Sequence, residues 1–389
     1  MRLIYPSYYH SFSCQASQCP DTCCKGWRIS IDGDTLKRYG AAKGPEGEWL
    51  REGVDHRSRA YRQKNGRCVF LDRRRLCGLF LRLGEAMMCR TCRVYPRHKE
   101  PYGDRLEISL SLSCPAAAQL ILNWAEPVEY RERIRPDREG EPDQAADREL
   151  LEGLLRVREA MWAVLRGEGE SSYQAAAVLA LAHDGERRLA AGDRSGLERV
   201  CRFYESPAAV SSLEKELAPY REMGFQRRQL ERAFLRELDR LETVSEGWEE
   251  LLFAARRCQL GGRPGERYER VRGQMGSGEE RERRDRELRE RQERNLLEYF
   301  LYLFYAGGVY EGGGYGKAKL AVFSLCAVRI LAESWRAVYG GSRERAFVRA
   351  AYLYSRQLEH SDRNLGRLER FVERDPSGAL TGLLACLLG

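Results

Sequence analysis

Nine of the thirteen cysteines lie within the first 114 of 389 residues, at spacings that are typical of metal ligands. The nine are Cys14, Cys19, Cys23, Cys24, Cys68, Cys77, Cys89, Cys92 and Cys114. The other four stand singly along the remaining chain, at Cys201, Cys258, Cys326 and Cys386. This distribution predicts an N-terminal third whose fold is organised around sulfur chemistry.

The redox compartment limits what these thiols can do. The start of the chain, MRLIYPSYYHSF, has neither the apolar core nor the cleavage site of a secretory signal. The longest apolar stretch, residues 320–328, is too short to span a bilayer. We therefore expect a cytoplasmic protein without a membrane segment, in which thiols stay reduced. An odd number of clustered cysteines also argues against a closed disulfide framework, which leaves metal binding or redox chemistry.

The positive charge of the chain is concentrated with the cysteines. Residues 1–120 contain 21 Lys and Arg against 12 Asp and Glu, whereas the rest of the chain contains 45 against 46. Cationic neighbours lower the pKa of thiols and offset the charge of metal-bound thiolates. A nucleic-acid surface is the rival interpretation, but the basic residues are dispersed rather than gathered on one helix face. We therefore expect no nucleic-acid partner.

Residues 1–125 read as a small α+β metal-binding domain. Apolar residues alternate over 27–31 and over 106–112, which predicts two strands. The runs on either side of Asp72–Arg75 look like a hairpin, and a short helix is expected over Leu81–Met88. A second helix is expected to follow Cys114-Pro115.

The rest of the chain reads as helical, so the predicted fold class is mainly α. Residues 126–148 are acidic, contain prolines and lack periodicity, which predicts a linker. Over residues 149–389 apolar residues recur at three- and four-residue spacing, which predicts an all-helical domain. Helices are expected near 147–167, 172–191, 231–258, 279–305, 318–338, 344–358 and 379–388, with a break at 261–265.

The clustered cysteines fall into four groups, Cys14-x4-Cys19-x3-Cys23-Cys24, Cys68-x8-Cys77, Cys89-x2-Cys92 and Cys114-Pro115. Neighbouring side chains diverge in regular structure, so Cys23 and Cys24 need a sharp turn at Gly26 or serve different sites. The C-x2-C spacing lets one turn present two sulfurs to one metal. Cys114 precedes a helix whose N-terminus would stabilise a thiolate. A four-thiolate zinc site and an iron–sulfur cluster both satisfy this pattern.

Other sequence patterns carry less information. Cys19-x3-Cys23 begins the motif of radical S-adenosylmethionine enzymes, but Gly26 stands where that motif needs its third cysteine. The glycine-rich segment Gly307–Gly316 lies between two helical runs, which favours a helix–helix connection over a cofactor loop. No pair of histidines has metal-ligand spacing among His10, His56, His98, His183 and His360.

Four segments together resemble the flagellin lysine-N-methylase family of bacteria. They are YPSYYHSFSC, CPDTCCKGWRISID, CVFLDRRRLCGLFLRLGEAMMCRTCRVYPR and LSLSCPAAAQLIL. The resemblance covers about the first 125 residues, and it lies in the order and spacing of the cysteines. The same module is similar to small zinc- or iron-chelating cysteine-cluster proteins, so the module alone does not establish an enzyme.

The resemblance implies methyl transfer from S-adenosylmethionine to lysine side chains of flagellin, in an enzyme that carries a [4Fe-4S] cluster, with zinc as the alternative. The nine clustered cysteines would be the metal ligands. Direct transfer to a neutral lysine and chemistry mediated by the cluster both remain open. The residues Arg90, Arg93, Tyr95 and Arg97 crowd the Cys89/Cys92 turn. They would either hold the carboxylate of the donor or offset the charge of the cluster.

Two functions from other classes stay open at this stage. One is a zinc-binding structural or interaction module without catalysis, and the other is a redox sensor that uses Cys89 and Cys92 as a dithiol. The sequence names no catalytic residue and does not indicate an oligomeric state.

Overall fold

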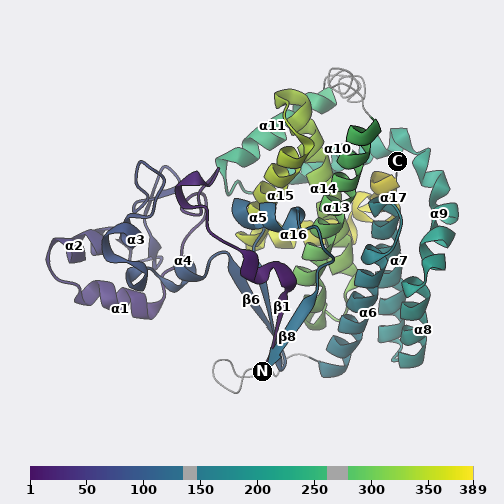
Figure 1. The fold of residues 1–389 in the computed structure, drawn as a ribbon, viewed down its shortest axis with the longest axis horizontal. Helices are drawn as coiled ribbons and strands as arrows, with labels where there is room; N and C mark the ends of the chain where they lie inside the picture. The colour runs from purple at the N-terminus through teal and green to yellow at the C-terminus, as the bar shows by residue number, and fades with distance from the viewer. Residues whose placement is uncertain (135–146, 261–278, 389) are drawn as a thin grey trace.

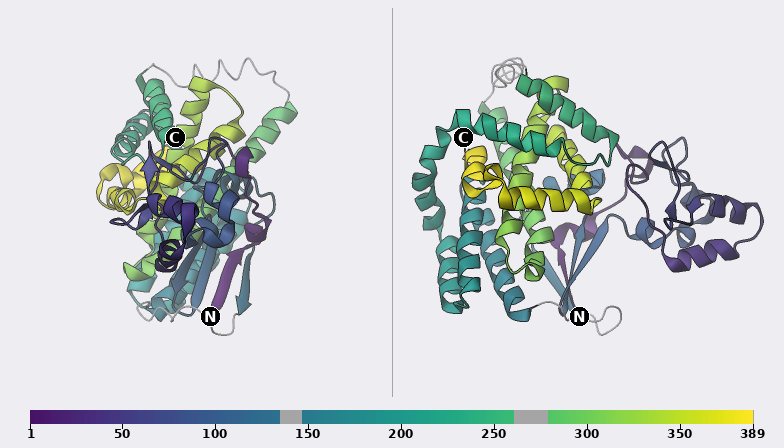
Figure 2. Two further views of the ribbon diagram at one scale, coloured as in Figure 1. Left: turned by 90° about the vertical axis from the view of Figure 1, so that its left-hand side faces the viewer. Right: turned by 180° about the vertical axis from the view of Figure 1, so that it is seen from behind.

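The computed structural model describes residues 1–134, 147–260 and 279–388. Figure 1 shows a small lobe that projects from a larger helical body, with a sheet between the two. The right-hand view of Figure 2, from behind, also shows the lobe projecting from the body. The predicted mainly-α fold class is confirmed. Among the described helices, none is long and apolar enough to cross a membrane.

The small lobe, residues 13–96, is called the cysteine lobe here. It has its own hydrophobic core, in which Tyr39, Tyr61 and Phe70 pack with Cys68 and Cys89. Its helical elements are η2 (Ala16–Gln18), α1 (Gly33–Ala41), α2 (Gly44–Glu52), α3 (Gly78–Leu83), η3 (Glu85–Met87) and α4 (Arg90–Val94). Its strands are short, and they are β2 (Val54–Asp55), β3 (Ala60–Tyr61), β4 (Gln63–Lys64) and β5 (Arg67–Cys68).

Some local predictions for the cysteine lobe are wrong in detail. Residues 27–31 form no continuous strand, because only an isolated bridge joins Ser30 to Ala60. The helix expected over Leu81–Met88 is broken at Gly84, whose φ of 76° ends α3 and separates it from η3. The hairpin around Asp72–Arg75 is present as a tight turn that a single bridge between Leu71 and Cys77 closes.

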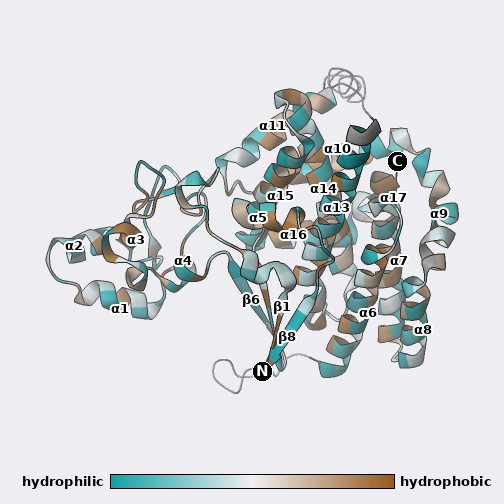
Figure 3. Cartoon of the chain, in the orientation of Figure 1, coloured by the Kyte–Doolittle hydropathy of each residue, from teal (hydrophilic) through white to brown (hydrophobic). Residues whose placement is uncertain are grey.

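A four-stranded sheet, ordered β6-β7-β1-β8, joins the lobe to the body. Its strands are β1 (Arg2–Pro6), β6 (Arg97–Tyr102), β7 (Arg105–Leu110) and β8 (Tyr130–Ile134), and η1 (Ser7–Ser11) follows β1. β1 and β7 run parallel, while the two outer pairs are antiparallel. The outer strands β6 and β8 are hydrophilic (Figure 3), and charged edge strands protect a sheet from pairing with other chains.

The body consists of long helices packed around α14. The helices are α5 (Pro115–Leu122), α6 (Arg148–Arg166), α7 (Ser171–Ala190), α8 (Arg194–Glu205), α9 (Pro207–Arg221), α10 (Gly224–Leu238), α11 (Glu246–Leu260), α13 (Glu279–Phe304), η4 (Tyr305–Tyr310), α14 (Tyr315–Tyr339), α15 (Arg343–Glu359), α16 (Asp362–Arg374), η5 (Pro376–Gly378) and α17 (Leu380–Leu388). α14 contacts α7, α11, α13, α15 and α16 and is buried along most of its length. A helix that is apolar on all sides belongs at the centre of a core.

The body confirms most of the expected helices, with two differences. The run predicted as one helix over 231–258 is two helices, α10 and α11, and three helices were missed altogether, α8, α9 and α16. The glycine-rich segment Gly307–Gly316 contains η4 and connects α13 to α14, which confirms the favoured interpretation. The break expected at 261–265 lies outside the described residues.

The hydrophobic cores divide the chain differently from the expected boundary at residue 125. Tyr8, Leu110 and Cys114 share one core with the helices of the body, although all three precede that boundary. Residues 130–134, expected within a linker, form the edge strand β8. A buried ion pair fixes the sheet to α6, because Arg158 Nη1 donates to Glu107 Oε2 at 2.9 Å. The Arg158 guanidinium overcomes the effect of burial and lowers the pKa of Glu107.

Glu298 on α13 is a buried carboxyl whose titration is expected to weaken the fold as pH rises. Burial raises its pKa to about 7, against 4.5 for an ordinary glutamate, although Arg166 lies 3.7 Å away. The folded protein therefore holds this proton between about pH 4.5 and 7, while the unfolded chain releases it. Stability from this group is present at low pH and is lost as pH rises through that window, by roughly 3 kcal/mol.

Glu298→Gln should remove this pH dependence. We expect urea unfolding followed by circular dichroism to show the variant gaining stability relative to the parent between pH 5 and pH 8. The difference between the two proteins isolates Glu298 from other titrating groups. A stability difference that does not change with pH would contradict the argument.

Candidate functional site

Six of the clustered cysteines lie close enough for their thiols to shift one another's pKa. We call them the inner cysteines, and they are Cys23, Cys24, Cys68, Cys77, Cys89 and Cys92. The backbone explains part of this convergence, because the N–H of Cys68 donates to the carbonyl of Cys24 at 2.8 Å. The bridge from Leu71 to Cys77 then brings the second half of the hairpin to the same place.

The remaining three of the nine, Cys14, Cys19 and Cys114, are the outer cysteines. The thiols of Cys19 and Cys23 both raise the pKa of Cys114. The thiol of Cys14 raises the pKa of Cys19. Cys23 therefore stands between the inner and the outer cysteines. No disulfide joins any of the cysteines, all of which lie within the described residues, and the four single ones lie in helices of the body. Cys114 packs in the core of the body with Cys201, Cys326 and Cys386, and the other eight clustered cysteines lie in the cysteine lobe.

The adjacent residues Cys23 and Cys24 are brought together by a turn. The Cys23 thiol donates a hydrogen bond to Cys24, and this raises the pKa of Cys23. Gly26 follows with a φ of 90°, which favours glycine. A Cβ there would also lie 1.9 Å from the carbonyl oxygen of Val244, so the turn packs closely against the connection from α10 to α11. The structure thus matches the sharp-turn alternative.

Three of the cysteines occupy the N-cap positions of helices, Cys77 of α3, Cys89 of α4 and Cys114 of α5. Burial raises the pKa of Cys114 to about 11, although the N–H groups of Ala116 and Ala117 act in the opposite direction. The expected stabilisation of its thiolate by the helix is therefore present but is outweighed by burial. Cys89 differs, because a hydrogen bond from Cys92 lowers its pKa to about 6.

The chemistry of the donor set fits a thiolate-bound metal group, although the geometry is not that of a formed site. Within the described residues, no three histidine, cysteine or acidic side chains converge as ligands of one ion. The inner cysteines nevertheless supply thiols from separate segments of the lobe, and Cys24, Cys68 and Cys89 among them are buried. Soft thiolate donors are the ligands that iron–sulfur clusters and zinc prefer. Metal binding by the nine cysteines stays a prediction.

Two tyrosines support the inner cysteines. The backbone N–H of Cys89 donates to the Tyr61 hydroxyl at 3.2 Å, and the hydroxyls of Tyr61 and Tyr39 lie 2.8 Å apart. Tyr39 also donates to the carbonyl of Met87 at 2.6 Å. At the start of α4, the N–H of Arg90 donates to Asp32 at 2.7 Å. These bonds fix the turn that carries Cys89 and Cys92.

The four residues expected to hold a donor carboxylate do not converge on one point. Arg90 and Arg93 are exposed on α4, and no acidic side chain of the described residues pairs with either. The Arg97 guanidinium instead lies over the rings of Tyr9 and Phe12. The Tyr95 hydroxyl hydrogen-bonds with Ser113 at 3.0 Å, beside the outer cysteine Cys114. Their role as a group stays a prediction.

A junction that sequence reasoning missed joins the cysteine lobe to α15. The ring of Trp27 stacks on His360 with centroids 4.3 Å apart, and Tyr95 lies beside both rings. His360 Nε2 lies 2.9 Å from the Ser113 hydroxyl. Burial and the nearby Arg356 lower the pKa of His360 to about 4, so this imidazole is neutral at physiological pH. Trp27 and His360 are too far apart in sequence for a local pattern to reveal the contact.

Arg356 is the second missed residue of this junction, and its guanidinium is buried. Its Nε donates to the carbonyl of Ser113 at 2.9 Å, directly before the outer cysteine Cys114. Its Nη1 donates to the carboxylate of Asp21 at 2.5 Å. Its Nη2 donates to the carbonyl of Thr22, the residue directly before Cys23, at 3.3 Å. One side chain of the body therefore positions two separate cysteine-bearing segments.

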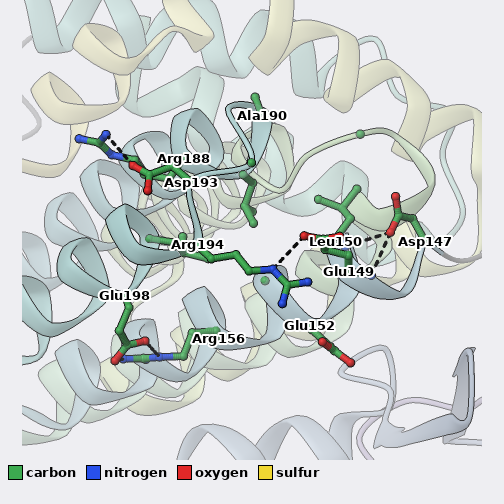
Figure 4. Close-up of a pocket in the computed structure, with 15 residues that line it drawn as sticks. Asp147, Glu149, Leu150, Glu152, Arg156, Arg188, Ala190, Asp193, Arg194 and Glu198 are labelled. Atoms are coloured by element: carbon green, nitrogen blue, oxygen red, sulfur yellow. Dashed lines mark hydrogen bonds and ion pairs between the residues drawn. The ribbon is translucent and has the colours of Figure 1, made fainter.

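The body also contains a pocket of about 560 Å³, between α6 and the start of α8, which Gly312 of the glycine-rich connection helps to line. Figure 4 shows that its arginines are already paired, Arg194 with Glu149, Arg188 with Asp193 and Arg156 with Glu198. None of the clustered cysteines lines it. Because its cations are paired within the protein, this pocket offers no free cation to an anionic ligand.

Comparison with known proteins finds one family model and several related proteins. The model of the FliB lysine N-methylase C-terminal domain matches residues 169–386. The lysine-N-methylases of Salmonella typhimurium and Salmonella choleraesuis are each 34% identical over 129 residues, which is 30% of this chain and 32% of theirs. The flagellar biosynthetic protein FliU of Salmonella muenchen is 34% identical over 130 residues, 30% of this chain and 75% of that protein.

The extent of these matches differs. The matched part spans about a third of the length of the two lysine-N-methylases. The family model covers the helical body, whereas the resemblance in the cysteine pattern lies in the first 125 residues. No solved structure matches the chain significantly.

Proposed function

The chain belongs to the FliB lysine N-methylase family, and on this premise we propose that it transfers methyl groups from S-adenosylmethionine to lysine side chains of flagellin. The observation that carries the proposal is the family match over residues 169–386 together with the names of the relatives. The reduced state of its thiols suits the cytoplasm.

Atoms and electrons balance in the direct transfer of a methyl group without a further reactant. The lone pair of a neutral lysine amine forms a bond to the methyl carbon, the bond from that carbon to the sulfonium sulfur breaks, and its electron pair stays on sulfur. The products are S-adenosylhomocysteine and a methylated ammonium, which releases a proton to water. In this direct route the protein must keep the amine neutral by desolvation and align it with the sulfonium.

The inner cysteines are the residues that would hold a [4Fe-4S] cluster, with zinc as the alternative. When bound, an iron–sulfur cluster supplies donor binding or electron transfer, whereas zinc would be structural. Tyr39 and Tyr61 hold the Cys89/Cys92 turn, and Arg356 holds the segments next to Cys23 and Cys114. Arg90 and Arg93 remain candidates for a donor carboxylate, because both are exposed beside Cys89 and no acidic side chain in the described part of the chain pairs with them.

The proposal is tested with protein purified without oxygen. Incubation with flagellin and S-adenosylmethionine should raise the mass of flagellin in steps of one methyl group, located on lysines by peptide mass spectrometry. Reactions without the donor, or with flagellin whose lysines are already blocked, should show no change. Intact flagellin of unchanged mass would overturn the proposal.

A hydrogen bond favours one second candidate, a thiol redox sensor. The neighbouring Cys92 thiol lowers the pKa of Cys89 to about 6, and a thiol of low pKa in a C-x2-C pair is typical of redox-active dithiols. Iron, zinc and labile-sulfide analysis separates the candidates, because a cluster protein is brown and contains iron and sulfide. A sensor would bind no metal tightly and would show a reversible disulfide between these two residues.

A further inference from the structure

A second pocket, of about 430 Å³, lies within the cysteine lobe, where residues 28–31 run alongside β3. The N–H of Tyr61 donates to Ile29 at 3.1 Å, and the N–H of Ile31 donates to Arg59 at 2.8 Å. The volume is within the range of small-molecule sites, about 300–1,000 Å³. Its lining residues are Arg28, Asp55, Ser58, Ala60, Tyr61, Arg62 and Gln63.

Two guanidinium groups in this pocket have donors to spare. Arg28 is exposed, and no acidic side chain of the described residues pairs with it. Arg62 uses its Nε to donate to the carbonyl of Val54 at 3.0 Å, and its two terminal nitrogens have no hydrogen-bond partner among the described residues. Unpaired guanidinium groups recognise carboxylates through paired hydrogen bonds. This pocket therefore differs from the one in the body, whose arginines are all engaged.

A carboxylate faces the same pocket. Asp55 accepts hydrogen bonds from the N–H of Arg57 at 3.0 Å and from the hydroxyl of Ser58 at 2.6 Å, which hold it in place. Each carboxylate oxygen has a further lone pair for an ammonium group. The pocket thus presents two cations and one anion, the complement of an α-amino acid zwitterion.

The pocket is adjacent to the inner cysteines. Tyr61 lines it, and the hydroxyl of the same residue accepts the hydrogen bond from the N–H of Cys89 at 3.2 Å. A single residue, Tyr61, therefore both lines the pocket and contacts the Cys89/Cys92 turn. A ligand in the pocket would lie beside the thiols rather than in the distant body.

We propose that this pocket binds the aminocarboxylate end of S-adenosylmethionine, with Arg28 and Arg62 on the carboxylate and Asp55 on the ammonium. The inference rests on the proposed function, because it assigns the donor of that reaction to a place. It differs from the assignment of the donor carboxylate to Arg90 and Arg93, which line no part of this pocket.

The test compares two probes by calorimetry on metal-loaded protein. S-adenosylhomocysteine carries the aminocarboxylate, and 5′-methylthioadenosine lacks it. The parent protein should prefer the first probe by about tenfold or more, as expected for charged hydrogen bonds. The double variant Arg28→Gln/Arg62→Gln should lose this preference by weakening only the first probe. The matched control Arg90→Gln/Arg93→Gln should keep it.

The outcomes separate the pocket from the reaction. If the control variant loses the preference, or if the pocket variant keeps it, the proposal is overturned while the methylase function stands. A parent protein that binds neither probe also overturns it, and the separate methylation assay then decides whether the proposed function falls too. Iron content and circular dichroism confirm folding, and Arg28→Gln alone repeats the test at a residue that the fold does not use.

Discussion

Replacing Cys92 with serine is expected to release the metal group that we propose for the inner cysteines and to unfold much of the cysteine lobe. Cys92 donates to Cys89 and interacts with Cys23 and Cys24, so its loss removes a ligand from the centre of the inner cysteines. Metal binding supplies on the order of 10 kcal/mol to small metal-dependent domains. Bound iron or zinc per chain should fall at least tenfold, and limited proteolysis should then cut within residues 13–96. Cys24→Ser and Cys77→Ser should behave in the same way.

The single cysteines of the body provide matched controls. Cys201→Ser and Cys386→Ser place a hydroxyl in apolar surroundings and so lower stability, but neither thiol lies near the inner cysteines. Cys258→Ser changes a thiol that contacts the carbonyl of Ser334. All three variants should retain the metal content of the parent. If they lost metal as Cys92→Ser does, the distinction between the two sets of thiols would be wrong.

The proximity of several cysteines could be predicted from the sequence because it depends on short-range geometry, whereas their convergence on one metal stays a prediction. A C-x2-C turn and a tight hairpin bring sulfurs together whatever the rest of the chain does, and Cys68, Cys77, Cys89 and Cys92 lie as such motifs predict. The alternation of apolar residues over 27–31 wrongly predicted a strand, because alternation reports burial and not pairing with a neighbouring strand. Ile29 and Ile31 are buried in the lobe, but the segment gains only an isolated bridge instead of a ladder.

Long-range contacts account for most of what was missed. Residues 131–133 are charged and exposed, and the register of residues 130–134 with β1 makes them a strand. α16 did carry a local signal, because Ser361 caps the N–H of Asn364 and Leu368, Phe371 and Val372 lie on one buried face. Nothing near Trp27 or Asp21 in the sequence indicates that α15 completes their surroundings, since those contacts cross more than 300 residues.

Arg356→Met should loosen the junction between the body and the cysteine lobe. The change removes the bonds to Asp21, Thr22 and Ser113 and leaves the Asp21 carboxylate without its partner. Breaking a buried ion pair costs about 3–5 kcal/mol. Because the Asp21 side chain is 19% exposed, water recovers part of this, and we expect a loss of about 2–4 kcal/mol in the free energy of unfolding. Metal retention during dialysis should fall with it.

Arg363→Met is the matched control, because the Arg363 side chain is 83% exposed and lies 3.7 Å from Glu242. Its loss should cost less than about 0.5 kcal/mol, as for other exposed pairs. Adding Asp21→Asn to Arg356→Met separates the causes. If the cost comes from the orphaned carboxylate, the double variant should be more stable than Arg356→Met alone by about 1 kcal/mol or more. If the losses in the free energy of unfolding from the two changes simply add, the orphaned charge is not the cause. Arg356 then stabilises the cysteine-bearing segments through its hydrogen bonds to their backbone.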